Sequence, residues 1–415
     1  MSAGPPPPRP LGLSGVLARA FITSKLTPLL LVAAFGLGLM ALAALPREEE
    51  PQISVPMVDV HVRADGLAAA DAVELVTRPL EAIVLGIPGV EHVYSRTEDD
   101  RAIVTARFLV GTDPDEAILR VHEKVRANFD RIPLGIPEPL IVGRGINDVA
   151  VVVVTLRPEP AVVARWTDTA LHELADRVLS ELVKLPDVGL TYIVGGRPPE
   201  IRIEPDPSAL ALYGITLNQV VEKLAGANRS FAIGLMRDRG GTVPSHAGQT
   251  LRGVPDAGLL LLATRDGRPV YLGDVARVVH DGVPVEQRVW RLTRAPDGTW
   301  ERAPAVSIAI AKRAGANAVI LTEAVRDRLA ALGGSVIPDG IAADVTRDYG
   351  VTAQEKSDEL LFHLGLATVS IVALIWLAIG WREAVVTAVV IPVTILLTLF
   401  GAWILGYTLN RVSLF

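Results

Sequence analysis

The chain has 415 residues, of which 50% are hydrophobic and 21% are charged, and its formal net charge is −6. Most of the charge lies outside three long apolar runs, a mixture that fits neither a single soluble core nor a bare membrane bundle. Without a Lys/Arg-rich stripe the sequence predicts no nucleic-acid partner, and without cysteine it excludes disulfides, thiolate metal sites and a cysteine nucleophile.

The N-terminal region predicts a short tail followed by a membrane span. The proline-rich start MSAGPPPPRP predicts disorder, and the apolar run at 26–45 has about the 20 residues needed to cross a hydrocarbon core. Arg9, Arg19 and Lys25 precede this run, which predicts a cytoplasmic N-terminus. The alternative is a signal peptide with ALA at 41–43 as its cleavage site, but the run is longer than the roughly 7–15 residues of a signal-peptide core.

The segment after this run predicts a unit of alternating strands and helices. Val58, Val60 and Val62 alternate as in a half-buried strand, and an amphipathic helix follows. The sequence IPGVEHVY (87–94) then leads into the strand RAIVTARFLV (101–110). A second helix capped at 113 and a strand near PEPLIV complete a split βαβ layout with its helices on one face of a sheet.

A second copy of this layout follows and is interrupted by an insert. It begins with the apolar strand VAVVVVTL (149–156) and a helix, after which LPDVGLTY (185–192) repeats the earlier IPGVEHVY. The strand AVSIAIAK (305–312) and the helix at 315–332 supply the pieces that the second unit lacks. We therefore expect a discontinuous repeat with another subdomain inserted into its second unit.

The insert has its own start and turn signals. Thr216 and Gln219 have capping-box spacing, and a strand pair turns at Asp266 and Gly267. Between them, the glycine- and arginine-rich sequence at 234–249 predicts a long exposed loop.

The last two apolar runs predict a helical hairpin across the membrane. They occupy 360–379 and 384–405, and the four residues between them include Trp381 and Arg382, as in a tight cytoplasmic turn. The segment 46–359 is then external. The alternative is a buried helical hairpin of a large soluble protein.

The order of these pieces resembles the amino-terminal half of resistance-nodulation-division (RND) transporters, the proton-driven efflux pumps. Several sequences carry the resemblance, in this order: PREEEPQI, VTRPLE, LPDVGLTYIVGGRPPEIRIEPD, YGIT, LGDVARVV, GANAVIL, GWREAVVTAVVIPV and GYTLNRVSLF. It implies an α+β membrane protein with ferredoxin-like split βαβ porter subdomains and an inserted docking subdomain in a large periplasmic region. By this resemblance the chain divides into a cytoplasmic tail (1–25), a first transmembrane helix (26–45), the porter subdomain PN1 (46–140), the first part of porter subdomain PN2 (141–196), the docking subdomain DN (197–283), the second part of PN2 (284–340), a connector (341–359), two transmembrane helices (360–379 and 384–405) and the start of a connection to a fourth (406–415).

The resemblance also implies a substrate pocket and partners. Pumps of this family are homotrimers of the bacterial inner membrane that export hydrophobic or amphiphilic compounds through a periplasmic adaptor and an outer-membrane channel. The pocket-lining positions of the family fall on Val149, Val151, Tyr192 and Val194, and ordinary sheet core is the alternative for each. The loop at 235–249 is expected to contact a neighbouring subunit. No cofactor is expected.

Other classes of function have less support in the sequence. The seven histidines show no HxxxH or HExxH spacing and only four methionines are present, which disfavours the heavy-metal branch of the family. A membrane-anchored receptor would have only a four-residue turn and a short tail in the cytoplasm. An external enzyme would need a nucleophile and a base, and no motif for such a pair appears.

The three apolar runs contain no Asp or Glu, although proton coupling needs ionisable groups within the bilayer. In the resembling family the acidic pair of the proton relay lies in the fourth span. The sequence therefore predicts an amino-terminal fragment of a longer permease, without the relay.

The orientation of the spans can be tested by labelling, because the chain has no native thiol. A single cysteine at position 382 should react with an impermeant maleimide only after the cells are permeabilised, since positive charge marks the cytoplasmic side. Labelling of position 382 from outside intact cells would contradict the predicted topology.

Overall fold

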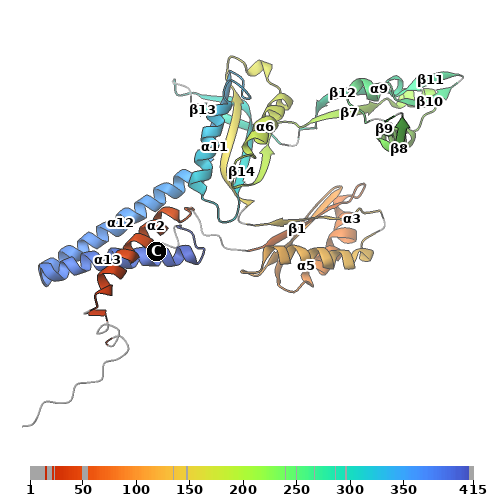
Figure 1. The fold of residues 1–415 in the computed structure, drawn as a ribbon. Coiled ribbons are helices and arrows are strands. Elements are labelled where there is room, and N and C mark those ends of the chain that lie inside the picture. Colours follow the sequence, from red (N-terminus) through yellow and green to blue (C-terminus); the bar gives the residue numbers. More distant parts are fainter. Residues whose placement is uncertain are drawn as a thin grey trace, which may run out of the picture.

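The computed structural model describes residues 15, 21–22, 24–48, 55–133, 135–145, 148–238, 240–248, 250–265, 267–285, 287–294 and 297–410. Figure 1 shows a bundle of long helices, two separate α/β units and an arm that extends from one of them. Nearly all of the predicted tail, Glu49 and Glu50 of the acidic stretch after the first span, and residues 411–415 lie outside the described residues.

The first unit is a four-stranded sheet covered by helices on one face. Its strand order is β2-β3-β1-β4, with every neighbouring pair antiparallel. Val58, Val60 and Val62 of β1 pack with Leu80 and Val121 of the helices in one apolar core, as the alternation predicted. Its elements are β1 (Met57–Arg63), α3 (Ala69–Ala72), a π-helical turn (Val73–Thr77), α4 (Arg78–Leu85), β2 (Val90–Glu98), β3 (Arg101–Phe108), α5 (Pro114–Ala127), a 3-10 turn (Phe129–Arg131) and β4 (Leu140–Arg144).

The second unit repeats this order. Its strands run β6-β14-β5-β15, again antiparallel, and β13 pairs with the first half of β14 on the same edge as β6. The arm is inserted between β6 and β14, the equivalents of β2 and β3. Its elements are β5 (Ala150–Pro158), a 3-10 turn (Val163–Arg165), α6 (Asp168–Leu182), β6 (Val188–Val194), β13 (Val289–Arg294), β14 (Trp300–Lys312), α11 (Ala318–Leu332) and β15 (Ile341–Asp348).

Several strands of the repeat differ from the expectation. The segment 341–359, predicted as a connector, forms β15 and the first turns of the following helix. The repeated sequences IPGVEHVY and LPDVGLTY themselves enter strands β2 and β6, which were not predicted. Both strands were missed because they are half-exposed and lack strict apolar alternation.

A left-handed backbone residue explains why the repeated sequence recurs. Gly89 and Asp187 occupy equivalent positions in IPGVEHVY and LPDVGLTY, and their φ angles are 90° and 65°. Only Gly, and less readily Asn or Asp, adopts this conformation at low cost. The turn that leads each helix into its strand therefore requires one of these residues at that position.

The arm consists of a two-stranded neck and a distal part. The neck pairs β7 (Pro199–Pro205) with β12 (Ala276–Gly282). Helix α8 begins with the predicted capping box of Thr216 and Gln219, and β10 and β11 form the predicted strand pair. The distal elements are α7 (Pro207–Tyr213), α8 (Leu217–Ala227), β8 (Phe231–Asp238), β9 (Gly241–Ala247), α9 (Val254–Gly258), β10 (Leu261–Arg265), β11 (Arg268–Tyr271) and α10 (Leu272–Val275).

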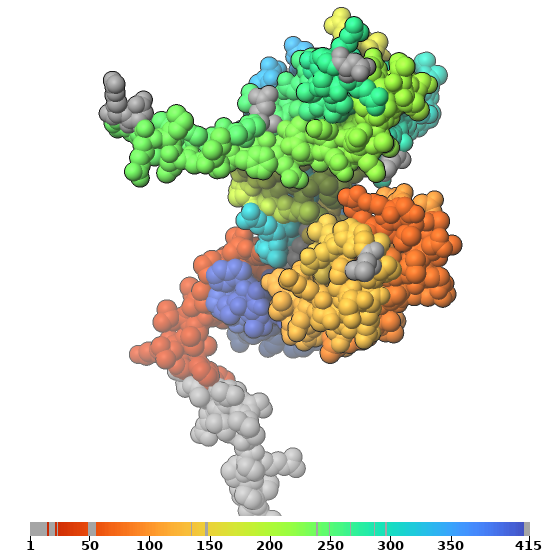
Figure 2. Space-filling model, turned by 90° about the vertical axis from the view of Figure 1, so that its right-hand side faces the viewer, coloured from red at the N-terminus to blue at the C-terminus, as the bar shows by residue number. Residues whose placement is uncertain are grey.

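The predicted loop at 234–249 is a β-hairpin instead. Strands β8 and β9 pair only with each other, and Figure 2 shows them, in green, extending away from the rest of the molecule. Their apolar side chains are exposed on both faces, including Phe231, Ile233, Leu235 and Met236. An isolated two-stranded hairpin is marginally stable in water, so this apolar surface is suited to contact with another chain.

Among the described residues, three helices are long and apolar enough to cross a membrane: α2 (Leu26–Ala44), α12 (Tyr349–Ala378) and α13 (Trp381–Ile404). Most side chains in their apolar stretches face outward, for example Leu366, Val369 and Leu374 of α12. Such surfaces fit hydrocarbon and do not fit the buried helical hairpin considered as the alternative. Helix α12 begins well before the predicted span because it continues directly from β15.

A glycine sets the close contact between α2 and α13. A Cβ built at Gly38 would lie 2.3 Å from Leu396 Cβ and 2.8 Å from the Leu396 carbonyl carbon. Small residues allow such backbone approach between membrane helices, where packing replaces the hydrophobic effect as the source of stability.

We predict that Gly38→Ala destabilises the chain by about 1–3 kcal/mol, because overpacking against a backbone cannot be relieved by a side-chain rotation. Thermal unfolding in detergent would show a lower Tm. Gly36→Ala on the same helix is the matched control, since nothing lies within 4 Å of a Cβ there. Equal effects of the two substitutions would contradict the assigned contact.

Candidate functional site

The second sheet has one face free of helices. Helices α6 and α11 pack on the face formed by Val152, Val154 and Ile308. On the opposite face Tyr192 of β6 lies beside Ala309 of β14, which in turn lies beside Val153 of β5. This surface is called the open face of the second unit.

In the structure, the four predicted pocket residues lie in environments that differ from one another. Tyr192 and Val194 lie two residues apart on β6, on the open face, and Tyr192 is 43% exposed. Val149 precedes β5 and is 44% exposed, whereas Val151 is only 7% exposed and belongs to the core cluster. Val151 thus has the core environment that the sequence left open as its alternative, and the other three remain candidates.

Polar groups continue the open face beside Tyr192 and Val194. The Thr155 hydroxyl lies 2.9 Å from the Ser307 hydroxyl and 2.9 Å from the Thr346 hydroxyl. Arg157 Nε donates to Asp344 Oδ2 at 3.1 Å. Sequence reasoning missed these residues, although the positions 153, 155 and 157 alternate along β5 and so indicate its second face.

The open face of the first unit carries a buried carboxylate. Asp59 lies between the core residues of β1, is 5% exposed, and forms an ion pair with Arg144 of β4. Thr105 Oγ1 donates to Asp59 Oδ1 at 2.6 Å, and His61 Nε2 lies 3.9 Å from Asp59 Oδ2. The sequence MVDVHV indicates that Asp59 and His61 share the second face of this strand, because they alternate with its apolar positions. The open face of the second unit therefore combines apolar side chains, hydroxyls and the Arg157–Asp344 pair, whereas that of the first unit is built around the Asp59–Arg144 pair.

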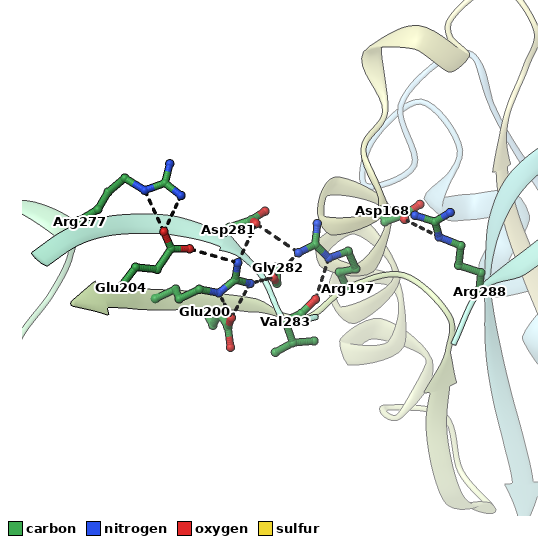
Figure 3. A network of polar contacts seen from close by, with 10 residues as sticks. Asp168, Arg197, Glu200, Glu204, Arg277, Asp281, Gly282, Val283 and Arg288 are labelled. Carbon is green, nitrogen blue, oxygen red and sulfur yellow. Dashed lines mark hydrogen bonds and ion pairs between the residues drawn. The ribbon is translucent and has the colours of Figure 1, made fainter. Parts of the chain in front are cut away.

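Arginines cross-link the two strands at the root of the arm (Figure 3). Arg197 Nε donates to the carbonyl of Val283 at 2.7 Å, and its Nη2 donates to Asp281 Oδ2 at 3.2 Å. Arg202 Nη2 donates to the carbonyl of Gly282 at 2.7 Å and to Glu200 Oε1 at 2.8 Å. These bonds cross-link β7 and β12 where they leave the second unit.

At the root of the arm, neighbouring groups stabilise the charged forms of Asp281 and Arg202. A hydrogen bond from the Gly282 backbone N–H, followed by the neighbouring Arg197 and Arg202, lowers the pKa of Asp281 below its ordinary value. The hydrogen bond to Glu200 raises the pKa of Arg202. A side chain at Gly282 would lie 2.5 Å from Arg197 Cβ, so the close packing of the arginine requires glycine at this position.

The described residues contain no group of three or more His, Asp or Glu side chains arranged to hold a metal ion.

Comparison with known proteins defines the family. The sequence profile of the AcrB/AcrD/AcrF family matches residues 17–415, which include the three helices, both units and the arm. The chain belongs to this family. The AcrB/AcrD/AcrF match confirms the RND resemblance drawn from the order of the motifs, and it points to a transporter rather than an enzyme.

Among characterised relatives, the chain is similar to "Multidrug resistance protein MdtC" of Edwardsiella ictaluri (strain 93-146). The two are 27% identical over 391 residues, which cover 94% of this chain and 37% of that protein. The chain therefore spans little more than a third of the length of this relative.

Proposed function

We propose that this chain supplies the porter units and three membrane spans of an inner-membrane permease that exports hydrophobic or amphiphilic compounds, driven by the proton-motive force. Membership of the AcrB/AcrD/AcrF family and the similarity to a multidrug resistance protein support this proposal.

The open face of the second unit is the observation that carries the proposal. Tyr192 and Val194 offer apolar surface next to Ser307, whose hydroxyl contacts that of the buried Thr155. Sites for small organic compounds combine apolar area with a few polar groups in this way. Since the described residues include no group of three or more His, Asp or Glu side chains that could hold a metal ion, an apolar or amphiphilic compound fits this face better than a cation.

We further propose a division of the chain into the subdomains of an RND permease. We assign the first unit to PN1, the second to the two parts of PN2 and the arm to DN. The arm would then face the periplasmic adaptor and the outer-membrane channel, and the exposed hairpin of β8 and β9 would contact a second copy of this chain within a homotrimer.

Proton coupling needs groups that these spans do not contain. The runs 26–45, 360–379 and 384–405 have no Asp or Glu, and His363 lies near one end of its run. A carboxylate within the bilayer is costly and is found where it serves a function such as a proton relay. We therefore assign the relay to other spans of the permease, as the family resemblance implies.

Binding of an amphiphilic fluorescent dye to the purified chain in nanodiscs tests the site. We expect Tyr192→Ala to raise the Kd about tenfold, because loss of an aromatic contact costs about 1.4 kcal/mol. Ile320→Ala is the control, since Ile320 is an exposed apolar residue on α11, which covers the opposite face. An unchanged Kd for Tyr192→Ala, or the same loss for both variants, would contradict the assignment.

Replacement of Phe231, Ile233, Leu235 and Met236 by serine tests the hairpin. These side chains are exposed and have no core of their own, so the units should stay folded while the oligomer dissociates to smaller species. Sedimentation in detergent measures the oligomer, and circular dichroism measures the fold. An oligomer of unchanged size would show that another surface makes the contact.

A further inference from the structure

A buried ion pair connects the second unit to the end of the first span. Lys312, the last residue of β14, donates from Nζ to Glu48 Oε1 at 2.5 Å. The two side chains are only 8% and 3% exposed. Burial of two charges is costly, and it is tolerated only where the charges stay paired and further hydrogen bonds satisfy them.

The segment that follows the third span completes this contact. Thr408 Oγ1 lies 3.2 Å from Glu48 Oε2 and donates to it, so each carboxylate oxygen has a partner. The backbone N–H of Glu48 donates to the Leu409 carbonyl at 3.0 Å, and that of Leu409 donates to the Pro46 carbonyl at 2.8 Å. Three segments far apart in the chain therefore meet at one carboxylate.

The ion pair lies at the junction between the helices and the second unit. Figure 1 shows α2 ending below the sheet that contains β14. The first N–H of α11, that of Ala318, donates to the Arg47 carbonyl at 3.3 Å. Any displacement of the second unit from α2 must separate Lys312 from Glu48 and leave the buried Lys312 charge without its carboxylate, which is strongly unfavourable.

Between described residues, the ion pairs of the first unit are internal to it, from His61 and Asp59 on β1 to Arg144 on β4. The chain enters this unit through 49–54 and leaves it through 145–149.

We propose that Glu48 and Lys312 form an ionic latch that holds the second unit, α2 and the segment after α13 together as one rigid body. Glu48 and Lys312 are positioning residues: the latch transmits movement of the membrane helices to the open face of the second unit. The proposal concerns the connection itself and does not depend on which compound is carried.

Distance measurements between two spin labels test the latch in the full chain. The chain has no cysteine, so Arg177→Cys on α6 and Met40→Cys on α2 give one label on each side of the junction. In nanodiscs, double electron–electron resonance should give a single narrow distance peak. Glu48→Gln should abolish that peak in favour of a broad distribution, because the Lys312 charge loses its partner and the second unit separates from α2.

Two further variants separate the latch from a general loss of folding. The exchanged pair Glu48→Lys with Lys312→Glu should restore the narrow peak, because attraction across the junction returns. Glu359→Gln removes one partner of the exposed Lys356–Glu359 pair on α12 and should leave the peak unchanged.

Either of two results would overturn the proposal. One is a narrow peak in folded Glu48→Gln, and the other is a broad distribution in the exchanged pair. If Glu48→Gln fails to fold, the exchanged pair decides alone: a folded chain with the narrow peak supports the latch, and failure to recover that peak rejects it.

Discussion

Both helices of each unit lie on the same face of their sheet, and the candidate site exists because of this. Each helix joins two strands that run parallel with one antiparallel strand between them, in the orders β2-β3-β1-β4 and β6-β14-β5-β15. Right-handed crossovers in such an arrangement place both helices on one side. The other face cannot be covered by the unit itself, so side chains such as Tyr192 and Asp59 point away from the helices.

The arm shows how an insertion is accommodated without loss of the sheet. It leaves the second unit after β6 and returns before β14, so the strands on either side of the insertion still become neighbours. The two neck strands need support at the point of exit, because an isolated strand pair is weak. Arg197 and Arg202 supply it with bonds to backbone carbonyls, which depend little on the identity of the neighbouring side chains.

The junction with the membrane helices uses a different kind of interaction from the units. The cores of the two units are apolar, and such cores tolerate hydrophobic substitutions that keep the total volume. A buried pair such as Lys312 and Glu48 does not tolerate separation, since each charge then loses its compensation. Covalent continuity adds to this, because β15 passes into α12 with only the Asp348 cap between strand and helix.

Local features of the molecule were determined by the sequence alone. The capping box at Thr216 and Gln219, the alternation at Val58, Val60 and Val62, and the three apolar runs all predicted elements that the structure contains. These features depend on side chains a few positions apart, whose geometry is set by the period of a helix or a strand. The repeated turn at Gly89 and Asp187 belongs to the same class, because a left-handed residue restricts the side chain at its own position.

Only the tertiary structure decided which residues meet across long separations. Val151 and Tyr192 look alike as candidates in the sequence, and their strand pairing and helix coverage place one in the core and the other on the open face. Lys312 and Glu48 lie 264 positions apart, and neither has a local pattern that predicts burial. The reason is physical: a local period determines which face of an element a residue occupies, whereas the neighbour of that face depends on how the whole chain folds.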